Sequence, residues 1–99
     1  MEPSKRFFNS VSEGNLWIYI LALAKEQEIQ EKEITSLIFE KFGFLPNGLM
    51  VKTVLFRLKN EGYASREKLK GEKAYKTTEK GLKELEKAKS ACQDLLQKI

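Results

Sequence analysis

The residue types that most enzyme chemistry needs are scarce in this chain. It has no histidine and a single cysteine, Cys92. A zinc site of the usual Cys/His type therefore cannot be built within one chain, and neither can a Ser-His-Asp or Cys-His nucleophile. The six glycines are scattered singly, so the sequence contains no phosphate-binding glycine loop. We therefore expect no catalytic residue, no metal and no cofactor, and a binding protein rather than an enzyme.

The distribution of the basic residues along the chain points to a function. The 99-residue chain has a net charge of +4. Residues 46–78 hold eight basic residues against three acidic ones, a net charge of +5, whereas residues 16–45 have a net charge of −2. Phosphate contacts dominate the affinity of proteins for DNA, and they require such a concentrated basic segment. The alternative is an ordinary solvated surface, as in the Lys/Glu-rich proteins of thermophiles.

Three helices are predicted between residues 16 and 61. Residues 16–24 are apolar on every side, which indicates a helix that is buried all round. Residues 31–42 carry apolar side chains at three- and four-residue spacing and are followed by Gly43, which favours a left-handed helix end. Asn47 can cap a third helix that runs to about Glu61.

A hairpin and a long helix are predicted to follow. Residues 63–67 and 73–77 have the composition of two short strands, with Gly71 in the turn between them. Thr78 is a good cap for a last helix from Glu79 to about Lys98. Residues 25–31 are interpreted as a polar connection.

The order of helix, helix, helix, hairpin and long helix is that of the winged helix-turn-helix. In that arrangement one helix enters the major groove and the hairpin wing reaches the backbone or the minor groove. The predicted fold class is α+β and mostly α, with a three-helix core, a two-stranded β-hairpin wing and a long C-terminal dimerisation helix. We divide the chain into an N-terminal arm or short helix (1–14), a winged-helix DNA-binding domain (15–78) and the C-terminal dimerisation helix (79–99). Ser10 and Glu13 have the spacing of a capping box, which predicts a helix start there.

Two motifs carry a resemblance to a known family. The run from Val54 to Tyr63 looks like the L-x-R-L-x-x-x-G end of a winged-helix recognition helix. The run from Ala74 to Gly81 looks like the Y-x-x-T-x-x-G that leaves the wing and opens the last helix. With the opening apolar helix, the chain from Asn15 to Ile99 resembles the PadR-like and MarR-like transcriptional regulators, particularly the very short versions in archaea and their viruses. It departs from PadR proteins at Lys52, where a tyrosine is usual, and it lacks the long C-terminal helical domain of larger members.

The resemblance implies a function. Members of the family are homodimers that bind pseudo-palindromic DNA as repressors or activators. We therefore expect a homodimeric transcriptional regulator that binds double-stranded DNA in a sequence-preferring way. One alternative is a winged-helix protein–protein interaction module without specific DNA binding, whose basic wing meets an acidic protein. The other is an enzyme, or an accessory subunit of one, that works with carboxylates alone.

The candidate DNA-binding residues lie on the third helix and the wing. They are Lys52, Thr53, Phe56 and Arg57 on the helix, and Arg66, Lys68, Lys70 and Lys73 on the wing. Arg57 could fork onto a guanine edge, and Thr53 could touch a thymine methyl or a phosphate. Phe56 could meet a base methyl, or it could pack against the second helix. The alternative for Arg57 is a surface ion pair near the hairpin, and for the wing residues it is ordinary solvation.

The last helix carries the candidate dimer interface. Its apolar residues step by three and four, as in a coiled-coil seam: Leu82, Leu85, Ala88, Cys92, Leu95, Leu96 and Ile99. A helix with such a stripe needs a partner, which we expect to be a second copy, aided by residues 1–13. The alternative is that the helix folds back onto its own core. Cys92 could form an inter-subunit disulfide, or it could be a small buried apolar residue.

Three further expectations concern partners and location. Trp17 could line a pocket for a small-molecule effector at a dimer interface, or it could be a plain core aromatic. The longest apolar stretch is nine residues, whereas a helix needs about 20 to span a bilayer, so we expect no membrane segment. The N-terminus lacks the pattern of a secretory signal, so we expect a cytoplasmic protein, in the host cytoplasm if it is viral.

Overall fold

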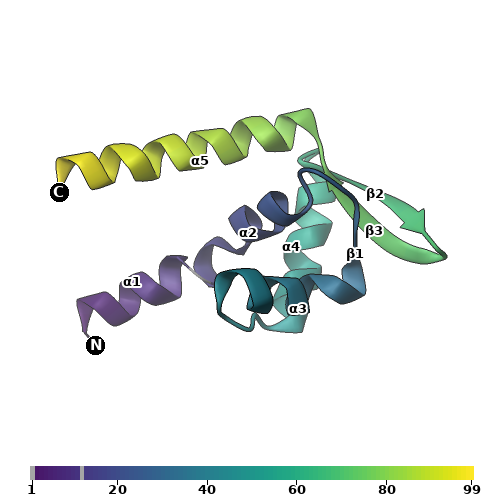
Figure 1. The fold of residues 1–99 in the computed structure, drawn as a ribbon, viewed down its shortest axis with the longest axis horizontal. Coiled ribbons are helices and arrows are strands. Elements are labelled where there is room, and N and C mark those ends of the chain that lie inside the picture. The colour runs from purple at the N-terminus through teal and green to yellow at the C-terminus, as the bar shows by residue number, and fades with distance from the viewer. Residues whose placement is uncertain (1, 12) are drawn as a thin grey trace.

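A computed structural model describes residues 2–11 and 13–99 of the chain. Its elements in order are α1 (Pro3–Val11), the short 3-10 helix η1 (Glu13–Asn15), α2 (Leu16–Leu23), β1 (Ile29–Gln30), α3 (Glu31–Phe42), α4 (Gly48–Asn60), β2 (Ala64–Leu69), β3 (Glu72–Thr77) and α5 (Glu79–Lys98). Figure 1 shows α2, α3 and α4 gathered in the middle, the β2–β3 hairpin projecting on one side, and α1 and α5 extending on the other. Within the described residues, no helix is both long and apolar enough to cross a membrane.

The core forms where α2, α3 and α4 meet. It is filled by Leu16, Ile20, Leu21, Ile34, Ile38, Val51, Leu55 and Leu58, all buried. Each helix contributes residues at three- and four-residue spacing, which places them on one face. None of residues 16–24 is exposed, but Trp17 and four others are only half-buried. The prediction that this helix is buried on all sides is therefore correct only in part.

Local capping signals set the helix ends that the sequence predicted. Helix α3 has the predicted bounds, and Gly43 follows it with a φ of +83°, in the left-handed region where glycine is favoured. The Asn47 side chain accepts hydrogen bonds from the backbone N–H groups of Leu49 and Met50 at the start of α4. The helix start predicted at Ser10 is wrong, because Ser10 belongs to α1, and residues 1–14 contain this helix rather than a loose arm.

The sheet has three antiparallel strands in the order β1-β3-β2. The β2–β3 hairpin is longer than predicted, and Lys70 and Gly71 form its turn with φ values of +54° and +81°. Two consecutive positive φ values are typical of the tight turns that match the twist of a hairpin. The prediction of a polar connection over residues 25–31 missed β1. Ile29 pairs there with Tyr75, and Gln30 with Ala74.

The junction between the wing and α5 is built around the second motif. The Thr78 hydroxyl donates to the carbonyl of Gly62 at 2.6 Å and accepts from the N–H of Gly81 at 3.2 Å. A Cβ on Gly81 would overlap the carbonyl oxygen of Tyr63 and lie 2.8 Å from Cγ2 of Thr77. A glycine at this position therefore lets α5 start directly against the connection between α4 and β2.

Candidate nucleic-acid interface

A groove of about 710 Å³ lies between the start of α4 and the wing. Residues of α3, α4, β2 and β3 line it, among them three of the candidate DNA-binding lysines: Lys52, Lys68 and Lys73. Lys52 comes from α4 and the other two from the wing, so the fold joins basic residues that lie up to 21 positions apart in the sequence.

The two wing lysines are direct neighbours across the hairpin, since Lys68 pairs with Lys73 in the register of β2 and β3. Like charges directly opposite each other destabilise an antiparallel pair. None of the ion pairs found among the described residues involves Lys52, Lys68 or Lys73. The groove therefore concentrates positive charge that an anion would stabilise.

The two acidic residues of the groove have other partners. The Nζ of Lys32 lies 3.9 Å from the carboxylate of Glu72. The carboxylate of Glu31 accepts a hydrogen bond of 3.3 Å from the Tyr75 hydroxyl. Burial raises the pKa of Tyr75, and the nearby Arg66 side chain opposes that shift. Arg66 stands opposite Tyr75 in the middle of the hairpin, whereas Lys70 stands in the turn at its tip.

The outward side of α4 carries the other candidate residues. Thr53, Phe56 and Arg57 are all exposed. Phe56 is 58% exposed, so its predicted alternative of packing against the second helix is wrong. Arg57 does not line the groove of Lys52 but a separate cavity of about 430 Å³ shared with Trp17, Tyr63 and Glu84. The ion pairs of the described residues do not include Arg57, so its alternative as an ion-pair partner near the hairpin is not observed.

Leu49 is a residue of this surface that the sequence interpretation missed. It is 74% exposed, at the start of α4 beside the groove. By residue type alone, a leucine next to Met50 and Val51 suggests a position in the core. The signal that could have found it is its spacing of four and seven residues from Thr53 and Phe56, which places all three on one side of a helix.

Trp17 is a core aromatic that also lines a cavity, and a pocket for an effector at a dimer interface stays a prediction. It packs against the core cluster, and it also lines the cavity that it shares with Arg57. The cavity lies between the start of α2, one side of α4 and the first turns of α5.

The candidate dimer residues divide into two groups along α5. Leu85 is buried and Ala88 is half-buried within the same chain, so for these residues the helix does fold back onto its own core. Leu82 lies at the edge of this contact, with 37% of its surface exposed. The remaining four are exposed: Cys92, Leu95, Leu96 and Ile99. Within one chain, Cys92 is therefore not the buried apolar residue of its alternative interpretation.

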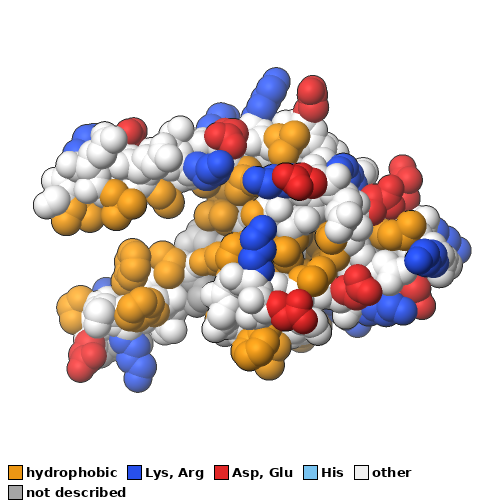
Figure 2. Space-filling model, in the orientation of Figure 1, with side chains coloured by type: hydrophobic (Ala, Val, Ile, Leu, Met, Phe, Trp, Pro, Cys, Tyr) orange, Lys and Arg blue, Asp and Glu red, His pale blue; other side chains and the backbone are white. Residues whose placement is uncertain are grey.

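Helix α1 carries a second exposed apolar face, formed by Phe7, Phe8 and Val11. Figure 2 shows hydrophobic side chains gathered along the side of α5 that looks toward α1 and along α1 itself.

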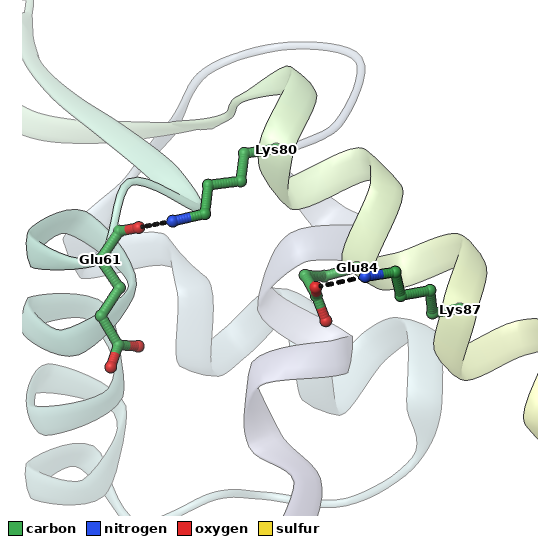
Figure 3. A network of polar contacts seen from close by, with 4 residues as sticks. All are labelled: Glu61, Lys80, Glu84 and Lys87. Atoms are coloured by element: carbon green, nitrogen blue, oxygen red, sulfur yellow. Dashed lines mark hydrogen bonds and ion pairs between the residues drawn. The ribbon is translucent and has the colours of Figure 1, made fainter.

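Polar contacts fix the root of α5 to the end of α4 (Figure 3). The Nζ of Lys80 donates to the Glu61 carbonyl at 2.6 Å and lies 4.6 Å from the centroid of the Tyr63 ring. Lys87 and Glu84 form an ion pair of 3.2 Å within α5, one turn further along. The contacts of Lys80 therefore tie the direction of α5 to that of α4.

No protein-family model matches this chain, and no curated protein matches it significantly. Several solved structures do. A PadR family transcriptional regulator from Eggerthella lenta DSM 2243 is 18% identical, with a TM-score of 0.81 over 95% of this chain and 86% of that one. A transcriptional regulator from Clostridium thermocellum is 23% identical, with a TM-score of 0.75 over 90% of this chain and 92% of that one.

A third structure contains DNA. Bacillus subtilis PadR, in complex with operator DNA, is 26% identical, with a TM-score of 0.65 over 73% of this chain and 45% of that one. The chain thus corresponds to less than half of that protein. The MarR-like and the archaeal or viral parts of the resemblance stay predictions. In its architecture, the chain has the PadR-like winged-helix fold, and these similar structures are transcriptional regulators.

Proposed function

We propose that this chain is a homodimeric transcriptional regulator that binds double-stranded DNA in a sequence-preferring way, and that it is not an enzyme. In this proposal α4 enters the major groove and the basic wing contacts the backbone or the minor groove. The observation that carries it is the groove in which Lys52 of α4 meets Lys68 and Lys73 of the wing. The likeness of the fold to PadR proteins, one of them in complex with operator DNA, supports it.

The charges of the groove give the binding energy a physical source. Lys68 and Lys73 repel each other across the free hairpin, because they face each other in its register. A phosphate between or beside them adds two attractions that offset this repulsion. Such contacts release counterions from the DNA and supply a large, salt-dependent part of the affinity of a protein for DNA.

The dimer supplies the second half of the proposed DNA contact. The exposed apolar side chains of α5 and α1 are the surfaces that a second copy would cover. Two α4 helices related by a two-fold axis would read successive major grooves, roughly 34 Å apart. The hydrogen bond from Lys80 to the Glu61 carbonyl at the root of α5 would hold that spacing.

The test is fluorescence anisotropy with a labelled duplex from upstream of the protein's own gene and a scrambled duplex, across a salt series. We expect tighter binding to the upstream duplex and a steep decrease of affinity with salt. The double variant Lys68→Gln/Lys73→Gln removes four phosphate contacts from a dimer, so the log–log salt slope should shrink by about 3 to 4.

The matched control is Lys83→Gln/Lys87→Gln, which removes the same charge from exposed positions of α5. It should leave the salt slope near that of the unchanged protein. An equal effect of both double variants would contradict the groove as the DNA contact. No binding to either duplex at low salt would contradict the proposed function as a whole.

A further inference from the structure

From Leu49 to Phe56, the outward side of α4 presents mainly carbon. Leu49 is 74% exposed and Phe56 is 58% exposed, and Thr53 lies between them on the same side of the helix. The Thr53 hydroxyl donates to the Leu49 carbonyl at 3.0 Å. Its hydrogen is therefore used within the helix, so the side chain offers a partner its methyl group and an acceptor oxygen, and no donor. We call Leu49, Thr53 and Phe56 the apolar strip.

Cations flank the apolar strip on its two sides. Lys52 lies on one side, in the groove that also holds Lys68 and Lys73. Arg57 lies on the other side, at the separate cavity. An apolar partner surface without negative charge would not match this pattern. The major groove of DNA does match it, because base edges form its floor and phosphates form both of its walls.

The largest apolar group on the floor of the major groove is the C5-methyl group of thymine. Most other exposed positions of the four base pairs are hydrogen-bond donors or acceptors, and cytosine has only a C–H where thymine has its methyl group. Covering a donor or acceptor with leucine or phenylalanine leaves it unsatisfied, which costs free energy. Covering a methyl group removes apolar surface from water, which is favourable.

We propose that the apolar strip selects thymine methyl groups, so that the preferred DNA has A·T pairs under the first two turns of α4. This inference rests on the proposed function and adds the chemistry of the target to it. Leu49, Thr53 and Phe56 are the specificity-determining residues, and the flanking Lys52 and Arg57 contribute attraction to the phosphates.

The test begins with duplexes that the full chain selects from a random library. Each thymine of a selected duplex is then replaced by uracil, which pairs with adenine in the same way and lacks only the methyl group. Burying one such carbon corresponds to about a fourfold change in affinity. We expect losses of about this size at a few thymines in each half-site and no loss at the others.

Two variants connect the methyl groups to the apolar strip. Leu49→Ala and Phe56→Ala should each reduce the thymine-to-uracil affinity ratio toward one at the positions that the removed side chain covers. Both positions are exposed, so the fold should remain, which circular dichroism checks. The control is Phe39→Ala, since Phe39 is 55% exposed on α3 outside the apolar strip. It should leave the thymine-to-uracil ratios unchanged.

The possible failures can be told apart. Equal binding of a selected duplex with thymine or with uracil throughout would overturn the methyl inference and leave the proposed DNA-binding function standing. Unchanged thymine-to-uracil ratios in the two variants would overturn the assignment to the apolar strip. Enrichment of no duplex at low salt would overturn the proposed function together with this inference, and it would favour a protein as the partner of α4.

Discussion

Gly81 shows how one residue can decide the relative position of two elements. Its lack of a side chain lets the Tyr63 carbonyl approach the first turn of α5. The change Gly81→Ala would push backbone against backbone, and overpacking of this kind typically costs about 1 to 3 kcal/mol of unfolding free energy. We expect a lower melting temperature, measured by differential scanning calorimetry or circular dichroism.

The control for this prediction is Gly48→Ala. A Cβ on Gly48, the first residue of α4, would meet nothing within 4 Å, and its φ is not positive. Alanine also restricts the unfolded chain more than glycine does, which can add about 0.4 to 1 kcal/mol of stability at a compatible site. Equal destabilisation by both changes would contradict the role of the Tyr63 carbonyl.

Tyr75 gives the stability of the fold a dependence on alkaline pH. Burial raises the pKa of its hydroxyl, with the Glu31 charge adding to the shift and Arg66 opposing it. The unfolded chain therefore loses this proton at a lower pH than the folded chain, near the usual tyrosine value of about 10. The stabilisation is present below that pH and is lost as the pH rises through the folded pKa.

The variant Tyr75→Phe cannot ionise, so its unfolding free energy should decrease less between pH 8 and pH 11 than that of the unchanged protein. Urea unfolding at both pH values measures this difference, and the loss of the hydrogen bond to Glu31 cancels because it lowers both values. The same decrease in both proteins would show that Tyr75 does not contribute.

At the scale of elements, the wing carries a conflict between stability and binding. Lys68 and Lys73 face each other in β2 and β3. The change Lys68→Glu replaces a repulsive pair with an attractive one, which is worth about 0.2 to 1 kcal/mol. The same change places a negative charge where we propose a phosphate. We expect a higher melting temperature and at least a tenfold weaker affinity for the duplex in the anisotropy experiment.

Lys70→Glu is the matched control for the stability half of this prediction. It makes the same change of charge, but Lys70 stands in the turn and has no partner in the strand register. Its melting temperature should stay near that of the unchanged protein. A rise of equal size in both variants would indicate a general effect of lower net charge rather than the Lys68–Lys73 pair.

The elements that the sequence predicted best are those with local signals. The bounds of α3 and the cap at Asn47 were confirmed, because a helix end depends on a few neighbouring residues. Strand β1 was missed because two residues show no periodicity, and its pairing with Tyr75 spans 46 positions of sequence.

The candidate site could be predicted only as a set of residue types. Lys52, Lys68 and Lys73 were named from the sequence, but their meeting in one groove depends on how the wing packs beside α4. The separation of Arg57 from them depends on which side of α4 meets α2 and α5. Both are properties of tertiary packing, and the charge and spacing within one segment do not determine them.

At the scale of the whole molecule, the amphipathic helices α1 and α5 extend from the same side of a compact centre (Figure 1). The molecule measures 46 × 27 × 22 Å. The first turns of α5 are anchored by Leu85, whereas Leu95 and Ile99 at its far end are 57% and 88% exposed. The buried and the exposed apolar residues are therefore separate along one helix, so the proposed dimer could be broken without unfolding the chain.

The variant Leu95→Glu/Ile99→Glu tests this separation. Charges without partners in an apolar interface are strongly unfavourable, so sedimentation equilibrium should show a monomer where the unchanged protein is a dimer. Circular dichroism should be unchanged, because neither residue contributes to the core. A monomer loses the second half-site, and since such linkage is worth about 10²- to 10⁴-fold, affinity for the full duplex should decrease steeply.

The control Gln97→Glu adds a charge between these positions in sequence but on the opposite side of α5, and it should remain a dimer with full affinity. A double variant that stays dimeric, or an unchanged protein that is monomeric, would contradict this seam and with it the two-fold arrangement of the α4 helices.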